Sequence, residues 1–207
     1  VRPYINENAF GKAPKKASDI LKVGDIARIT RDDDDNLLLA QVPDVSAALV
    51  SLRPTDGALL ALSGGFDFYQ SKFNRAIQAE RQPGSNFKPF IYSAALDQGF
   101  SLASIINDAP VVFDDAALES EWRPENYSGK FYGPTRLREA LVNSRNLVSI
   151  RLLQSIGISN AINYVTNFGF DPKHLSRDLS LALGSATITP FDLARGYATF
   201  ANGGFLI

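Results

Sequence analysis

The stretch around which this sequence is organised is RQPGSNFKPF, residues 81–90, which carries one serine and one lysine three positions apart. Its proline–glycine pair interrupts whatever structure comes before it. Its second proline lacks an N–H group and is tolerated in a helix only within the first turn. The apolar run FIYSAAL at 90–96 continues the pattern of a buried helix, and Gly99 is a plausible stop signal. The sequence therefore predicts a helix that begins near Ser85.

At such a helix start, residues i and i+3 share a face, so Ser85 and Lys88 are expected within reach of each other. A serine hydroxyl is a poor nucleophile until a base takes its proton, and only a neutral lysine can do so. Burial and the positive end of a helix both favour the neutral amine, while first-turn N–H groups face a developing oxyanion. Ser-x-x-Lys occurs by chance about once per domain of this size, however, so an N-capping serine and a surface lysine remain the alternative.

A second motif supports the chemical interpretation. The segment VNSRN at 142–146 places Ser144 and Asn146 about sixty residues after the first motif. This order of Ser-x-x-Lys and Ser-x-Asn resembles that of penicillin-binding proteins and serine β-lactamases. The flanking segments FNRA at 73–76, WRPENY at 122–127 and FANGG at 200–204 are similar to those of the transpeptidase domain of class A (bifunctional) penicillin-binding proteins. The resemblance covers about residues 45–207.

The resemblance implies an α+β fold in which helices surround an antiparallel sheet, here incomplete. It also implies a peptidoglycan D,D-transpeptidase that cross-links stem peptides through a serine acyl-enzyme. Ser85 would attack the D-Ala-D-Ala peptide bond, Lys88 would accept its proton, and Ser144 would relay a proton to the leaving amine. Asn146 would hold the lysine and the substrate backbone. β-Lactam antibiotics would acylate the same serine. Arg145 is assigned no catalytic role.

One departure from the family concerns its third motif, Lys-Thr/Ser-Gly, because no lysine here is followed by Ser or Thr and Gly. That motif supplies an oxyanion donor and a cleft wall. We therefore expect this chain alone to be poorly folded, or completed by a companion fragment that carries the motif, and nearly inert towards penicillin. The glycosyltransferase domain and membrane anchor of a periplasmic, inner-membrane protein are expected outside this chain. The alternatives are a β-lactam sensor or hydrolase of the same fold, and a non-catalytic scaffold.

Composition excludes several other classes of function. A chain of 207 residues, 45% hydrophobic, is long enough to bury a core, and its net charge of −1 gives no electrostatic case for nucleic-acid binding. The absence of cysteine excludes disulfides and thiol catalysis, and the one histidine, His174, leaves little for a metal site or a Ser-His relay. We expect His174 to be a solvated loop residue, and no cofactor or metal is predicted.

The first part of the chain differs in character from the rest, and we place a boundary after residue 44. Residues 1–44 are expected to be a remnant of a small inserted β-domain, often likened to an OB fold, and residues 45–207 the N-terminal part of the transpeptidase domain. One or two strands are predicted at 20–29. The acidic run DDDD at 32–35 is interpreted as an exposed turn rather than a metal site, because consecutive residues of an extended segment point in alternating directions.

Regular elements are expected in the larger part as follows. Strands at 47–52 and 57–62 form a hairpin buried on at least one face, because Pro54 and the Asp-Gly pair at 56–57 favour a turn. Residues 108–133 are expected to be a surface loop whose aromatic side chains pack it down. Helices are predicted at 137–142, 147–156, 159–168 and 191–201, with a stop at Gly157 and a start at Thr189.

Overall fold

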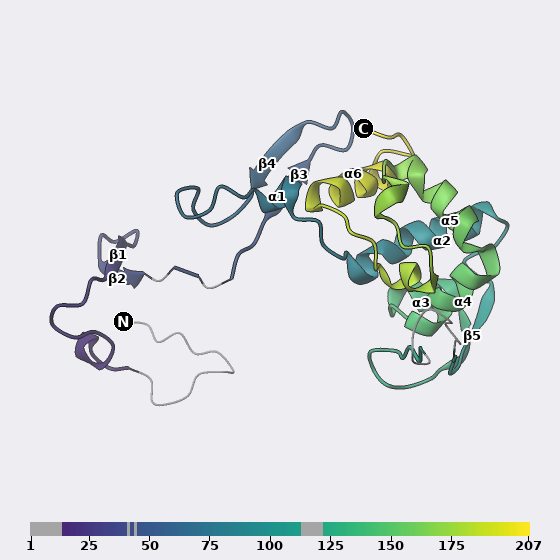
Figure 1. The fold of residues 1–207 in the computed structure, drawn as a ribbon, viewed down its shortest axis with the longest axis horizontal. Coiled ribbons are helices and arrows are strands. Elements are labelled where there is room, and N and C mark those ends of the chain that lie inside the picture. The colour runs from purple at the N-terminus through teal and green to yellow at the C-terminus, as the bar shows by residue number, and fades with distance from the viewer. Residues whose placement is uncertain (1–13, 41, 44, 113–121) are drawn as a thin grey trace. The chain divides into compact units, whose positions relative to one another are not determined.

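The computed structural model describes residues 14–40, 42–43, 45–112 and 122–207. By its internal contacts the chain divides into two compact units, Val1–Ser46 and Ala47–Ile207 (Figure 1). The part of the predicted surface loop that spans 113–121 lies outside the described residues.

The smaller unit contains one antiparallel hairpin after a short 3-10 helix, η1 (Ala17–Asp19). Strand β1 (Arg28–Arg31) pairs with β2 (Leu37–Ala40). The acidic run forms the turn between them, as predicted, and the Asp32 carboxylate accepts hydrogen bonds from the backbone N–H groups of Asn36 (2.8 Å) and Asp34 (3.1 Å). These bonds, with the Asn36 side chain, lower the pKa of Asp32. The prediction of strands at 20–29 was largely wrong, because only the residues from Arg28 onward find a partner strand.

The larger unit begins with the predicted hairpin, β3 (Leu49–Leu52) paired with β4 (Leu59–Ser63). The expectation that this hairpin is buried on one face was wrong for β4, which is exposed along its whole length. Helix α6 (Pro190–Ala201) packs against β3, whereas β4 makes its main contacts, apart from those with β3, with the one-turn helix α1 (Arg75–Gln78). Without a helix over it, the apolar side chains of β4 remain in solvent.

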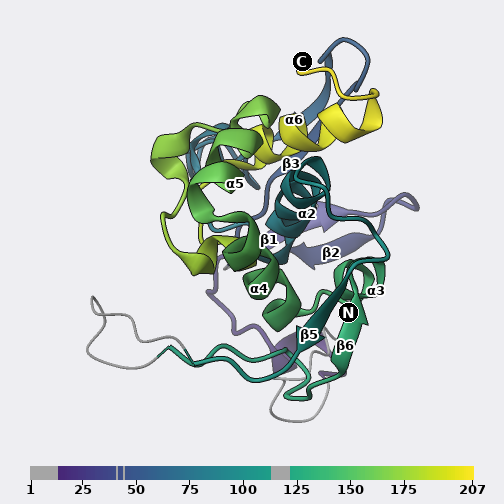
Figure 2. The same ribbon diagram turned by 90° about the vertical axis from the view of Figure 1, so that its right-hand side faces the viewer.

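The core of the larger unit surrounds helix α2 (Lys88–Asp97), which continues a 3-10 turn, η2 (Gly84–Phe87). Helices α4 (Asn146–Ile156) and α5 (Ile158–Val165) pack along α2, and α6 lies across it (Figure 2). Phe90 of α2 is fully buried, and its ring meets four aromatic neighbours from the helical part at 4.8–5.2 Å between centroids: Phe168, Phe170, Tyr197 and Phe200. The predicted helix starts and stops are confirmed within one or two residues when the 3-10 turns that adjoin α2 and α5 are counted, and the α+β class is confirmed.

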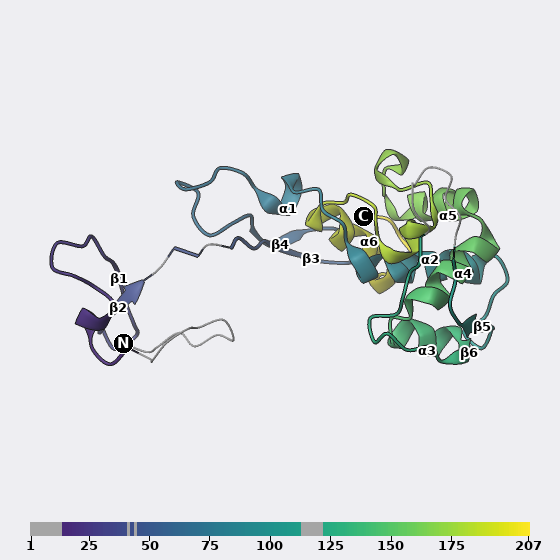
Figure 3. The ribbon, with the colours of Figure 1, turned by 60° about the horizontal axis from the view of Figure 1, so that its bottom comes forward.

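A second hairpin lies at the opposite end of this unit from β3–β4 (Figures 1 and 3). It pairs β5 (Ile105–Asp108) with β6 (Gly133–Arg136), which leads directly into α3 (Leu137–Val142). The sequence reasoning missed both strands, because four-residue strands that contain Asn, Asp, Gly and Pro carry no strand signal. Three 3-10 helices complete the described part: η3 (Thr166–Phe168), η4 (Pro172–His174) and η5 (Leu179–Leu183).

Candidate active site

The predicted nucleophile lies on the 3-10 turn η2, directly before α2. Ser85 is exposed, and its hydroxyl makes no hydrogen bond with any residue that the structure describes. Lys88 follows one turn later as the first residue of α2, and Pro89 stands in the first helical turn, where its missing N–H costs no helix hydrogen bond. The helix therefore starts as predicted, with an open hydroxyl at its N-terminal end.

This turn is fixed from two sides by residues far along the chain. The N–H of Gly84 donates to the carbonyl of Gly184 (3.2 Å), and a Cβ on Gly184 would lie only 2.0 Å from the Gly84 oxygen. Gly184 also has a φ of +78°, which disfavours any residue with a side chain. From the other side, the Tyr197 hydroxyl of α6 donates to the carbonyl of Asn86 (2.8 Å). The backbone that carries the serine is thus held by close packing that only glycine permits at position 184.

The structure brings the lysine of the first motif together with the serine and asparagine of the second. Lys88 is 1% exposed, and its Nζ donates to Ser144 O (2.7 Å), Ser144 Oγ (2.9 Å) and Asn146 Oδ1 (2.7 Å). All three contacts cross more than fifty residues of sequence. The alternative in which this lysine is a surface side chain is therefore wrong.

Burial lowers the pKa of Lys88 from its ordinary value of 10.5 to about 8. Among the described residues no carboxylate is hydrogen-bonded to this amine, so none of them offers the charged form an ion pair that offsets its desolvation. At a pKa of about 8, roughly one amine in ten is neutral at pH 7. The side chain is thereby suited to take a proton from a neighbouring hydroxyl.

The three partners of the amine differ in what they accept. A carbonyl oxygen and the Asn146 Oδ1 atom can only accept, so they use two N–H groups of Lys88 whether the amine is charged or neutral. The third partner, the Ser144 hydroxyl, both donates and accepts. When the amine is neutral its lone pair is therefore free to face a hydroxyl. This arrangement permits proton exchange between Lys88 and Ser144.

Ser144 holds an unusual backbone conformation that serves this contact. Its φ is +53°, in the left-handed region that residues other than glycine rarely adopt. Its own N–H donates to the carbonyl of Leu141 at the end of α3 (3.0 Å), and two residues later α4 begins at Asn146. The left-handed turn between two helices thus directs both the carbonyl and the hydroxyl of one residue at the same amine.

Three groups that the sequence reasoning did not single out surround the second motif. The Asn126 Oδ1 atom accepts the backbone N–H of Asn146 (2.8 Å), and Asn126 Nδ2 donates to both oxygens of the buried Asp108 carboxylate (2.8 and 2.9 Å). The Asn146 side chain donates to the carbonyl of Glu125 (2.8 Å). The only signal in the sequence was the segment WRPENY, which resembles the family but was interpreted as loop.

The aromatic residues of the same loop behave differently from one another. Tyr127 is fully exposed, whereas the Tyr132 ring lies 3.3 Å from the guanidinium carbon of Arg145. Trp122 is half-buried against the core. The expectation that these aromatics pack the loop down therefore holds for Trp122 and Tyr132 but not for Tyr127.

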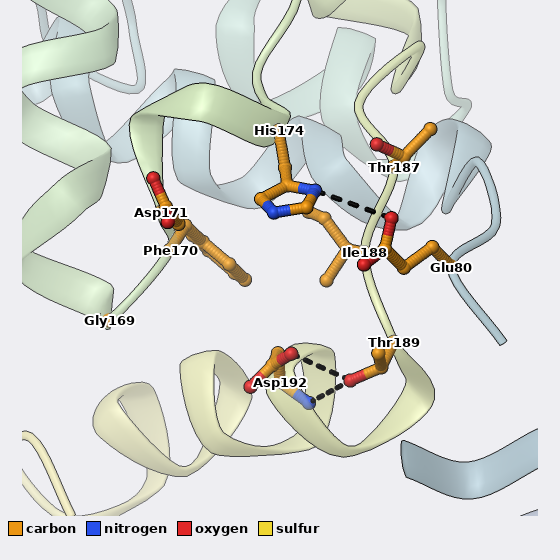
Figure 4. Close-up of a pocket in the computed structure, with 9 residues that line it drawn as sticks. All are labelled: Glu80, Gly169, Phe170, Asp171, His174, Thr187, Ile188, Thr189 and Asp192. Atoms are coloured by element: carbon orange, nitrogen blue, oxygen red, sulfur yellow. Dashed lines mark hydrogen bonds and ion pairs between the residues drawn. The ribbon is translucent and has the colours of Figure 1, made fainter. Parts of the chain in front are cut away.

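A pocket elsewhere in this unit contains none of the predicted catalytic residues (Figure 4). Its lining includes Glu80 and His174, whose Nδ1 lies 3.4 Å from the glutamate Oε2, with Asp171 and Asp192 nearby. The expectation of a solvated loop histidine needs correction, because His174 is only partly exposed and faces a carboxylate. The pocket is connected to the nucleophile turn through Ile188, which pairs with Arg81 in an isolated bridge.

Two features are absent from the residues that the structure describes. No group of three or more His, Cys, Asp or Glu side chains is arranged to hold a metal ion among them. Nor does any described helix have the length and apolar character needed to cross a membrane.

With this geometry in place, comparison with known proteins defines the class. Residues 47–207 match the family model of the penicillin-binding protein transpeptidase domain, and residues 1–45 match the penicillin-binding protein OB-like domain. The chain therefore belongs to the penicillin-binding protein transpeptidase family.

Individual relatives agree with this assignment. Penicillin-binding protein 1A of Pseudomonas aeruginosa is 53% identical over 206 residues, which is 100% of this chain and 25% of the relative. The chain thus spans about a quarter of the length of the curated relatives that it matches. The crystal structure of penicillin-binding protein 1A from Haemophilus influenzae has a TM-score of 0.81 at 42% identity, covering 86% of this chain and 27% of that one. The PonA1 protein of Mycobacterium tuberculosis in complex with penicillin V has a TM-score of 0.65 at 28% identity, covering 76% and 45%.

Proposed function

We propose that this chain supplies the nucleophile, the base and the proton relay of a peptidoglycan D,D-transpeptidase. The observation that carries the proposal is the buried Lys88 amine, whose three hydrogen-bond partners all belong to the second motif. An exposed serine one helical turn away is the group that such a base would activate. The match to the transpeptidase family supports this assignment.

In the first half of the reaction, the Ser85 Oγ attacks the carbonyl carbon of the terminal D-Ala-D-Ala peptide bond of a stem peptide. Neutral Lys88 takes the hydroxyl proton as the new C–O bond forms. The C–N bond to the last D-Ala then breaks, and the proton passes by way of the Ser144 hydroxyl to the leaving amine. The products are a serine acyl-enzyme and free D-alanine.

In the second half, the amine of another stem peptide attacks the acyl carbon. The new C–N bond forms, the C–O bond to Ser85 breaks, and the proton lost by the amine returns to the serine oxygen through the same groups. Asn146 keeps Lys88 in place through both halves and presents an amide to the substrate backbone. Because cell-wall peptides lie outside the bacterial cytoplasmic membrane, we propose that the complete protein acts there. β-Lactams would undergo the first half only, so that they acylate Ser85 and remain attached to it.

The experiment that tests this function is covalent labelling of the full-length protein that carries this chain. After incubation with a fluorescent penicillin, peptide mapping by mass spectrometry should locate the adduct on Ser85. The Ser85→Ala variant should show no adduct, because it lacks the hydroxyl that the proposal makes the nucleophile. An adduct on another residue, or unchanged labelling of the alanine variant, would contradict the assignment.

The same experiment separates the two alternative functions. A β-lactam hydrolase with this nucleophile would release hydrolysed penicillin with many turnovers per protein molecule. A non-catalytic scaffold would not be labelled. A transpeptidase should give one long-lived adduct per chain, and should exchange the terminal D-Ala of a model peptide for an added amine.

A further inference from the structure

Helix α4, which begins with the asparagine of the second motif, has no N-cap of its own. The residue before it, Arg145, makes no side-chain capping bond, so the first N–H groups of the helix need partners from elsewhere. Asn126 supplies one from twenty residues upstream. Its Oδ1 atom accepts the N–H of Asn146 at 2.8 Å and lies 3.4 Å from the N–H of Leu147.

The orientation of the Asn126 amide is determined by its surroundings. Its Nδ2 atom donates to the Asp108 carboxylate and to the carbonyl of Lys130 (2.9 Å), both of which can only accept. The opposite side faces backbone N–H groups, which can only donate. Asn126 is 5% exposed and Asp108 is fully buried, so water does not compete for these bonds. Each hydrogen-bonding position of the amide is therefore matched. A flipped amide would place its oxygen against the acceptors and its NH2 group against the backbone N–H donors.

We propose that the Asn126 amide, oriented by the Asp108 carboxylate, is a positioning group for the second motif; this inference rests on the proposed transpeptidase function. Asn126 fixes the backbone at the start of α4, and the neighbouring Glu125 carbonyl accepts the Asn146 Nδ2 group. The Asn146 Oδ1 atom is thereby left pointing at Lys88. Neither Asn126 nor Asp108 is hydrogen-bonded to Lys88 or Ser85.

The consequence is that this amide governs the rate of acylation rather than the binding of the acylating agent. Without it, the start of α4 is free to shift, and the acceptors of the Lys88 amine shift with it. A displacement of about 1 Å in a catalytic constellation costs up to about 10² in rate. The initial complex with a penicillin, which forms before any proton moves, should be affected much less.

The test uses the full-length protein and measures the saturating acylation rate and the half-saturating concentration of a fluorescent penicillin, together with the melting temperature. Asn126→Ala should lower the saturating rate by about 10- to 100-fold and change the half-saturating concentration by less than about threefold. Thr135→Val is the matched control, since Thr135 is a buried residue of β6 whose hydroxyl donates to the Gly133 carbonyl within the same strand. Thr135→Val should leave the acylation rate within about twofold of the wild-type rate, even if it lowers the melting temperature as much as Asn126→Ala does.

Exchange of the two side chains provides a second arm if the alanine variant does not fold. Asn126→Asp places two carboxylates in direct contact and should acylate more slowly than Asn126→Ala. Adding Asp108→Asn to that variant removes one of the two charges and restores a donor opposite an acceptor, and it should acylate faster than Asn126→Asp even though the Lys130 carbonyl then faces a carboxylate oxygen.

The outcomes separate this inference from the proposed function. Wild-type acylation by Asn126→Ala, or an exchanged pair that folds without recovering rate, overturns the positioning role while labelling at Ser85 leaves the function intact. Equal losses in Asn126→Ala and Thr135→Val would also overturn it, because general loosening would then suffice. A wild-type protein that penicillin does not label contradicts the proposed function, and the inference with it.

Discussion

The helices around α2 and the β3–β4 hairpin belong to one compact unit, yet they treat their apolar side chains in opposite ways. Phe90 of α2 is fully buried among aromatic rings, whereas Leu59 and Leu60 of β4 are 52% and 57% exposed. Every contact of the Lys88 amine comes from the helical part. The difference teaches that the candidate catalytic groups are held by helix packing, and that the hairpin is not needed to bring them together.

Truncation of the central aromatic residue should have the largest effect on stability. Phe90→Ala removes a fully buried ring and should lower the free energy of unfolding by about 3–5 kcal/mol. Urea unfolding of this chain, followed by the fluorescence of its one tryptophan, Trp122, measures the change. A loss below about 1 kcal/mol would mean that the packing around α2 does not dominate the stability of this unit.

Replacement of the lysine tests whether the buried site needs a base or only a charge. Lys88→Arg keeps a positive charge, but a guanidinium gives up no proton at neutral pH. Acylation of the full-length protein should fall by about 10² or more, the loss typical of a positioned base. Stopped-flow or gel-based penicillin labelling would measure it. Near-normal acylation would show that the residue acts only through its charge.

The pH dependence of acylation should follow the neutral fraction of Lys88. Because burial lowers the pKa of this amine to about 8, the rate should rise about tenfold between pH 6 and pH 7 and level off above pH 8. The lowered pKa of Lys88 also makes the free energy of unfolding depend on pH, and this too increases as the pH rises. The unfolded chain binds more protons between the two pKa values, so stability should rise from about pH 8 to about 10.5.

A flat acylation profile between pH 6 and pH 8 would argue against this lysine as the proton acceptor. Ser149→Ala is a useful control, because the Ser149 hydroxyl lies on α4 but makes its bonds to the Arg145 carbonyl and the Tyr92 hydroxyl. Its profile should keep the wild-type midpoint.

The smallest effect is expected on the hairpin. Leu60→Thr changes an exposed side chain of β4 to another residue that favours strands, and should alter the unfolding free energy of this chain by less than about 0.5 kcal/mol. The urea experiment used for Phe90→Ala measures it. A loss above about 2 kcal/mol would show that β4 is packed in solution and would remove the contrast with α2.

Much of the local structure could be predicted from the sequence, because its signals are local. The helix start near Ser85 follows from Pro83, Gly84 and Pro89, and the start and stop at Thr189 and Gly157 follow from capping chemistry. The β5–β6 hairpin was missed, since each strand has only four residues and mixes Ile or Thr with the strand-disfavouring Asn, Asp, Gly and Pro. The burial expected for one face of the hairpin does not hold for β4, because an apolar run predicts a strand but not what covers it.

The sequence by itself determined that a serine and a lysine share the start of a helix and that a Ser-x-Asn motif follows. The expectation that Asn146 holds Lys88 came only from the family resemblance, because hydrogen bonds across 56 and 58 residues depend on how the helices pack. The lowered pKa is likewise a product of burial, which no motif encodes. Only the tertiary structure placed Asn126 and Asp108 behind the second motif, since a buried asparagine in a polar loop looks like any solvated one until its partners surround it.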